Sequence, residues 1–232
     1  MMRKLSFPGR SNVLAQNGMA ATSNPLSSLE AINILKKGGN AVDAAIAASA
    51  VQSVVCPSAT GIGGDCFAII SFNGKNPISV NGSGIAPKKA NLEYFIDRKI
   101  NKIELSSPHS VTIPGAVHAW CSMHEKYGKL DLEEVLKSAE NYARNGSPVY
   151  EVEALAWKEN EIKLRENKNS KKLFLKNNHS YKFGEVFKNI PLANTIKLIS
   201  EKKIAGFYNS DVTIDMINTL NELGGLHTEE DF

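Results

Sequence analysis

The stretch Ala59–Phe67 reads ATGIGGDCF and combines three glycines with an aspartate and a cysteine. Such a composition could cradle a phosphate, carry a nucleophile or turn the chain sharply. A dinucleotide-binding loop has the pattern G-x-G-x-x-G between a strand and a helix, and a Walker loop has a lysine after its last glycine. Here Cys66 stands in place of the third glycine, a helical pattern precedes the loop and a strand pattern follows it. We therefore reject both nucleotide-binding interpretations.

Cys66 is the candidate nucleophile of this stretch. A cysteine attacks as a thiolate and needs a base or a positive field beside it. His109, His118 and His124 are available, but no spacing connects any of them with Cys66. Cysteine is among the most buried residue types, and Cys66 begins an apolar run. We therefore interpret Cys66 as a core residue.

Other catalytic patterns do not occur in the sequence. No HExxH, CxxC or GxSxG spacing is present, so we expect no metal site and no cofactor. The remaining role for the glycine stretch is conformational. Gly61, Gly63 and Gly64 would allow positive φ angles and close backbone approach where a buried helix turns into a strand.

The elements around this stretch are mostly helical. Asn24 and Asn40 are typical helix caps, Gly38-Gly39 ends the first helix, and Leu26, Leu29, Ile32 and Leu35 are expected to form its apolar face. The alanine-rich second helix should be buried on most sides. Asp131 with Glu134 resembles a capping box.

The expected helices are 25–37, 41–55, 91–98, 116–127, 131–144, 152–166, 191–203 and 212–223, with a further helix starting at 228, and the expected strands are 67–72, 78–81 and 111–113. Strands and helices in separate runs predict an α+β fold.

Composition excludes several functions. The chain has 232 residues, a net charge of +3 and few aromatic residues, so we expect no nucleic-acid partner. The longest apolar run is too short and too polar to span a bilayer, and we expect no membrane partner. Three cysteines without a framework, and no apolar segment before Pro8, predict a cytoplasmic protein with reduced thiols. Basic residues crowd one segment and are interpreted as a solvated face: Lys158, Lys163, Arg165, Lys168, Lys171, Lys172 and Lys176.

Several long motifs, taken in order, resemble one family. GMAATSNPLSS, ILKKGGNAVDAAIA and GIGGDCF are similar to successive blocks at the start of the γ-glutamyltransferases. Further along, SVTIPGAV, GFYNSD and LGGLHTEEDF resemble later blocks of the same family. The resemblance extends over the whole chain except the lysine-rich segment. We identify residues 1–232 as a partial large-subunit domain of a γ-glutamyltransferase-like protein, with a helical insertion at about 152–188.

The resemblance implies an N-terminal nucleophile hydrolase with αββα layers, incomplete in this chain. In that family a zymogen cleaves itself, and the new N-terminal threonine of a small subunit attacks a γ-glutamyl amide such as glutathione, with its own α-amine as base. The matched motifs do not include that threonine, so we expect no catalytic residue in this chain. The implied partners are a small-molecule amide and a small subunit. Alone, the chain is expected to be inactive and marginally stable.

One departure from the family concerns substrate binding. The family binds the substrate carboxylate with an arginine in a G-R-E-x-A-P block, or in G-S-G-R-A-P in a like-subgroup. This chain reads NGSGIAP, which puts Ser83 or Ile85 at the arginine position. Neither replaces a guanidinium that binds a carboxylate with two hydrogen bonds. The open alternatives are a small non-glutamyl amide such as oxamate as substrate, and an inactive truncated relative or assembly partner of a separate small subunit.

Overall fold

The computed structural model describes residues 13–232, and the predicted lack of a secretory signal concerns a segment that lies mostly outside them. The chain opens with two packed helices, α1 (Pro25–Lys36) and α2 (Ala41–Val55). The side chain of Asn24 accepts a hydrogen bond from the amide of Leu26 at 2.9 Å, and Gly38 ends the helix with φ of +94°. Both predicted boundary signals are confirmed.

The buried face of α1 differs from the prediction. Ser27, Glu30, Ala31 and Ile34 are buried, whereas Leu29 is 51% exposed. Of the predicted apolar face, Leu26 and Leu35 pack against the core at its edge, and only Leu29 points to solvent. Small residues at the contact allow α1 to lie close against the alanine-rich helix α2, so packing against this neighbour selects the face.

Helix α2 is buried on most of its surface, as predicted. Eleven of its 15 residues are buried, and Ala41, Ala45 and Ser49 form a narrow exposed line along it. Its N-terminus has a capping box in which the side chain of Asn40 accepts from the Asp43 amide and the Asp43 carboxylate accepts from the Asn40 amide. This reciprocal pair satisfies backbone donors that the first helical turn leaves free.

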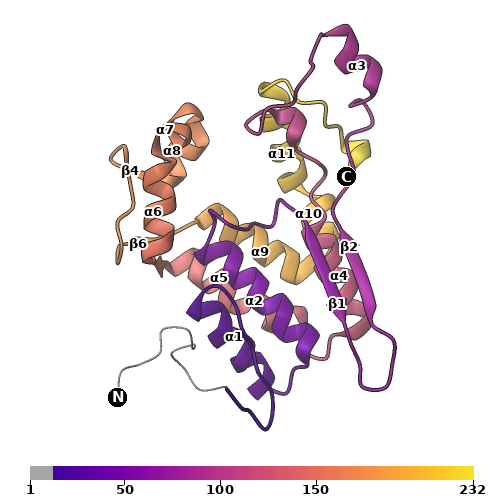
Figure 1. Ribbon diagram of the computed structural model, residues 1–232, viewed down its shortest axis with the longest axis vertical. Coiled ribbons are helices and arrows are strands. Elements are labelled where there is room, and N and C mark those ends of the chain that lie inside the picture. Colours follow the sequence, from indigo (N-terminus) through magenta and orange to yellow (C-terminus); the bar gives the residue numbers. More distant parts are fainter. Residues whose placement is uncertain (1–12) are drawn as a thin grey trace, which may run out of the picture.

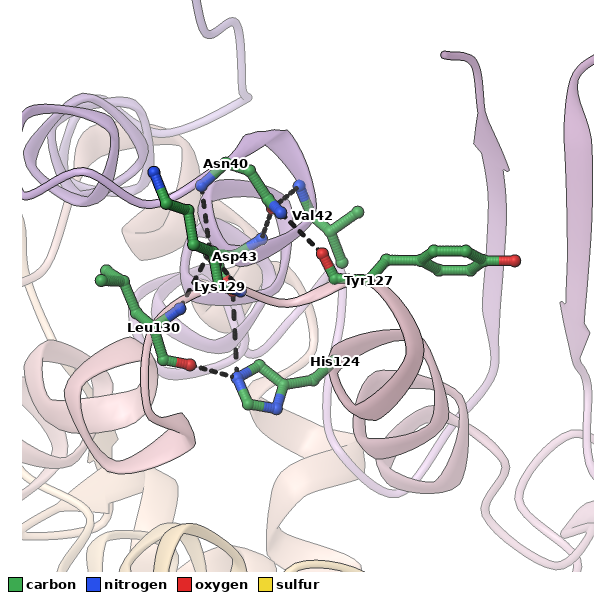
Figure 2. Close-up of polar contacts among 7 residues, drawn as sticks. All are labelled: Asn40, Val42, Asp43, His124, Tyr127, Lys129 and Leu130. Carbon is green, nitrogen blue, oxygen red and sulfur yellow. Dashed lines mark hydrogen bonds and ion pairs between the residues drawn. The ribbon is translucent and has the colours of Figure 1, made fainter. Parts of the chain in front are cut away.

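The Asp43 carboxylate also binds a segment 86 residues away in the sequence (Figure 2). It accepts from the amide of Lys129 at 3.1 Å and from that of Leu130 at 3.4 Å, and it is fully buried. His124 lies beside it, with Nε2 at 2.7 Å from the carbonyl oxygen of Leu130. One carboxylate therefore connects the start of α2 to the turn that contains Lys129 and Leu130.

The chain then forms an antiparallel hairpin of β1 (Cys66–Ile70) and β2 (Ile78–Gly82), with Cys66 opposite Gly82. Both predicted strands are confirmed. Alternate residues of each strand face helix α4 (Ala116–Tyr127), whose predicted bounds are correct. The other face exposes Phe67 and Ile69, at 66% and 79%.

The predicted role of the glycine stretch is wrong in one respect. Gly61, Gly63 and Gly64 do not have positive φ, and a Cβ added to Gly61 or Gly63 would meet no atom within 4 Å. The stretch is fixed instead through its backbone. The carbonyl oxygen of Gly64 accepts from the amides of Gly115 and Ala116 at 3.0 and 2.9 Å. These two bonds attach the stretch to the start of α4.

Helix α5 (Leu132–Asn145) begins at Asp131, but the predicted capping box does not form. Asp131 makes no side-chain cap, and the Glu134 carboxylate forms an ion pair with Lys37 at the end of α1. The Glu134 carboxylate is therefore bound to Lys37 and does not cap its own helix. Helix α5 packs against α2 and against helix α9 (Ile190–Lys202).

The remaining elements complete an α+β fold, as predicted (Figure 1). Residues 111–113 do not form the predicted strand; the amide of Ile113 donates to the carbonyl oxygen of Ile85, outside any ladder. Around the hairpin and the helical core lie α3 (Leu92–Asp97), α10 (Ala205–Tyr208), α11 (Asp211–Glu222) and the 3-10 turns Pro108–Ser110 and Glu229–Asp231.

The lysine-rich segment projects from the helical core (Figure 1). The single helix expected there is divided at Asn160, and a third helix follows. Aromatic rings around Trp157 form a small separate cluster. That the segment is an insertion stays a prediction. Its elements are α6 (Glu151–Glu159), α7 (Glu161–Glu166) and α8 (Lys168–Phe174) with the two-residue strands β3 (Ser147–Pro148), β4 (Leu175–Lys176), β5 (His179–Ser180) and β6 (Val186–Phe187).

One buried carboxylate connects this segment to the turn before the glycine stretch. Glu153 accepts from the amide of Ser58 at 2.9 Å and from its hydroxyl at 2.8 Å. Replacing Glu153 with alanine removes the shared acceptor of two donors of Ser58, a residue that is itself exposed, and we expect it to cost about 1 kcal/mol of folding free energy. Urea denaturation measures the loss. The exposed Glu159→Ala is the control, and equal stability of the two variants would contradict the assignment.

Candidate functional site

A cleft of about 450 Å³ lies where the hairpin ends, and we call it the 83–85 cleft. Three segments that are distant in sequence form its walls: the turn after β2, the start of α4 with the residues before it, and α10 with the C-terminal segment. Three titratable side chains line it, those of His118, Tyr208 and Asp231, and the other lining residues are apolar or uncharged. It is lined by Asn81, Gly82, Ser83, Gly84, Ile85, Ile113, Pro114, Gly115, His118, Ile204, Tyr208, Asn209, Asp231 and Phe232.

Two glycines allow these walls to approach each other. Gly84 has φ of +74°, and a Cβ placed on it would lie 1.8 Å from the carbonyl oxygen of Ile113. A Cβ on Gly115 would lie 2.2 Å from the carbonyl oxygen of Gly82. Only glycine fits such backbone contacts. The conformational role predicted for the glycine stretch thus belongs to these glycines.

Ser83 and Ile85, the predicted substrate-binding positions, both line the cleft. Ser83 is half-buried, and its amide donates to the side-chain oxygen of Asn81 at 3.1 Å. Ile85 is 62% exposed. The two positions therefore present a hydroxyl and an apolar side chain to the cleft, and neither brings a positive charge.

Tyr208 connects α10 to the wall that contains Gly115. Its hydroxyl donates to the carbonyl oxygen of Pro114 at 2.6 Å and accepts from the amide of His118 at 3.1 Å. Burial raises the pKa of Tyr208 to about 12, so the phenol is neutral at physiological pH. Tyr208 was not among the site residues predicted from the sequence. The resemblance of GFYNSD to a family block was the signal that could have directed attention to it.

The C-terminal segment contributes Asp231 and Phe232 to the third wall, and His227 lies in the same segment outside the lining. The Asp231 carboxylate accepts from the amides of Lys88 and Thr228 and from the Thr228 hydroxyl, and these bonds lower its pKa despite the opposing effect of burial. His227 is 1% exposed, with Nε2 at 2.9 Å from the carbonyl oxygen of Val111. Burial lowers the pKa of His227, which favours the neutral imidazole.

Cys66 does not belong to this cleft. It is half-buried, and burial raises the pKa of its thiol. Its predicted place in the core is confirmed by its packing against the main apolar cluster.

In residues 13–232 there is no group of three or more histidine, cysteine or acidic side chains arranged to hold a metal ion. Within the same residues, no helix has the length and apolar character needed to cross a bilayer.

Among the hollows outside the 83–85 cleft, two lie beside the lysine-rich segment and beside the hairpin. One of about 570 Å³ lies beside the lysine-rich segment, and Lys163 and Glu166 are the charged residues on its walls. The other, of about 230 Å³, is a groove between the exposed line of α2 and strand β1, with Trp120 and Met123 at its base. Neither is lined by the predicted substrate-binding positions Ser83 and Ile85.

Comparison with solved structures defines the class. The chain matches the γ-glutamyltranspeptidase of Helicobacter pylori with a TM-score of 0.90 and 30% identity, over 95% of this chain and 64% of that one. It matches a cephalosporin acylase from Bacillus halodurans with a TM-score of 0.87 and 34% identity, over 98% of this chain and 44% of that one. The described residues are thus part of an N-terminal nucleophile hydrolase fold, as predicted.

Sequence comparison then gives the family. The γ-glutamyltranspeptidase family model matches residues 27–232, and the chain belongs to that family. It is 32% identical over 222 residues to the glutathione hydrolase-like YwrD proenzyme of Bacillus subtilis, and the match covers 95% of this chain. The chain spans only 42% of the length of that relative.

Proposed function

We propose that the protein is part of an amide hydrolase or acyltransferase whose nucleophile is the N-terminal threonine of a separate subunit. The threonine hydroxyl attacks the amide carbonyl, its α-amine takes the proton, and the amine leaves with that proton. The acyl group then passes to water or to a second amine. Family membership and the 83–85 cleft support this assignment.

We further propose that the acyl group is not γ-glutamyl. The observation that carries this proposal is the lining of the cleft at Ser83 and Ile85, neither of which supplies a guanidinium for an α-carboxylate. The match to a cephalosporin acylase agrees with a broader choice of acyl group. Small amides such as oxamate are alternative substrates.

We also propose a cytoplasmic location, which the three free thiols support.

A partner subunit would pack on the exposed face of the hairpin. Phe67 and Ile69 form an apolar surface there, and the groove beside α2 continues it. An exposed apolar patch of this kind is typical of a protein–protein contact. We propose that the subunit with the threonine supplies this cover.

The test is a substrate screen on the chain alone and on the chain reunited with its partner subunit. The chain alone should not hydrolyse γ-glutamyl-p-nitroanilide, because it supplies no processed threonine. The reunited protein should hydrolyse small non-glutamyl amides faster than γ-glutamyl amides. Turnover by the chain alone would refute the proposal. Failure of the reunited protein on every amide would favour the alternative of an inactive assembly partner.

A further inference from the structure

His118 is the titratable side chain of the 83–85 cleft that the fold leaves free. The Tyr208 hydroxyl is engaged in two hydrogen bonds. The Asp231 carboxylate is 6% exposed and holds the C-terminal turn in place through three donors. Both side chains therefore serve the walls and are not available to a ligand.

The fold fixes the position of His118 while leaving its ring accessible. The residue lies in the first turn of α4, its amide donates to Tyr208, and its ring meets the Tyr208 ring edge-on with centroids 6.3 Å apart. The side chain is exposed, and Nδ1 makes one long contact, 3.5 Å, with the Ser122 hydroxyl. Within residues 13–232, Nε2 has no hydrogen-bond partner. A fixed residue with a free ring nitrogen can contribute specificity at little cost in conformational entropy.

The charges around the cleft select against an anionic ligand. No lysine or arginine of the described residues lines it, and the one ionised group on its wall is the Asp231 carboxylate. The apolar lining consists of Ile85, Ile113, Pro114, Ile204 and Phe232. A ligand that is apolar over most of its length and has one uncharged polar group matches this lining.

We propose that His118 is a specificity-determining residue which hydrogen-bonds an uncharged polar group at the far end of the acyl chain. This inference rests on the proposed function, since it names the acyl class that the same cleft accepts. The polar group is an amide, hydroxyl or keto oxygen, and the chain before it lies against Ile85. A neutral imidazole can donate from Nε2 to such an oxygen.

The test uses the chain together with its partner subunit and three p-nitroanilides of similar length. Pentanoyl ends in a methyl group, glutaramoyl in an uncharged amide and glutaryl in a carboxylate. We expect glutaramoyl to have the highest kcat/KM. His118→Ala should reduce that value about tenfold or more, mainly through KM, because one hydrogen bond to the bound substrate is lost. The pentanoyl substrate should change less than twofold.

Two variants control the experiment. His118→Gln keeps an N–H donor and should recover part of the glutaramoyl activity. His179→Ala removes an exposed histidine of the lysine-rich segment and should leave all three substrates unchanged. Equal loss on pentanoyl and glutaramoyl, or a preference for glutaryl that depends on His118, would overturn the inference.

A binding measurement separates this inference from the proposed function. Glutaramide is titrated into the protein while the NMR signals of the His118 imidazole are followed, with glutarate and pentanamide as comparison ligands. If no amide is turned over but glutaramide alone shifts the His118 signals, the proposed reaction fails and the assigned contact stands. If glutaramide leaves the signals unchanged, the assigned contact is wrong whatever the activity.

Discussion

Replacing Asp43 with alanine is expected to lower the free energy of unfolding by about 3–5 kcal/mol, one of the two largest effects that the structure predicts. The carboxylate is fully buried and accepts from three backbone amides, those of Asn40, Lys129 and Leu130 (Figure 2). Alanine offers none of these acceptors. The three amides would lose their shared acceptor, and the connection between the first turn of α2 and the turn before α5 would be lost with it.

Urea denaturation followed by circular dichroism measures this loss. Since a typical domain has only about 5–15 kcal/mol of stability, this loss is a large share of the total, and the variant is expected to unfold at a clearly lower urea concentration. Asp215→Ala, on the exposed side of α11, is the matched control and should change stability by less than about 0.5 kcal/mol. Asp43→Asn keeps the shape and one acceptor and should lie between the two. If Asp43→Ala is as stable as Asp215→Ala, the carboxylate does not join the two turns.

The second large effect concerns Gly84. Gly84→Ala is expected to cost about 3 kcal/mol or more, because it combines a disfavoured positive φ with a clash against backbone. The added Cβ would lie 1.8 Å from the carbonyl oxygen of Ile113, which belongs to a segment whose amide is already bonded to Ile85. Relief of the clash must move one wall of the 83–85 cleft.

Gly61→Ala is the matched control, since it makes the same chemical change in open space and without a positive φ. It should be neutral or stabilise the chain by up to about 1 kcal/mol through the unfolded state. Thermal unfolding compares the two variants. Similar melting temperatures for Gly84→Ala and Gly61→Ala would show that the two walls of the cleft do not require a glycine at position 84.

Much of the fold could be predicted because its signals are local. The caps at Asn24 and Asn40, the glycine after α1 and the bounds of α4 depend on residues within a few positions of one another. A capping oxygen bonds an amide two or three residues away, so the sequence carries the whole interaction. The ordered motifs that resemble the family likewise gave the fold class without any geometry.

Predictions failed where a partner from elsewhere in the chain competed with a local one. Glu134 has the spacing of a capping box with Asp131, yet it pairs with Lys37. The glycines of residues 61–64 have the composition of a strained turn, yet the strained backbone lies at Gly84. Composition shows that glycine is available, while the need for glycine depends on what approaches the Cβ position.

The sequence by itself determined most of the longer helices, the hairpin, the family and the two positions, Ser83 and Ile85, where a guanidinium is missing. The tertiary structure alone decided that His118, Tyr208 and Asp231 meet around those positions, and which of them remains free. The physical reason is the sequence separation of the contacts. Tyr208 reaches Pro114 across 94 residues and Asp231 reaches Lys88 across 143, and such pairs are set by the packing of whole elements.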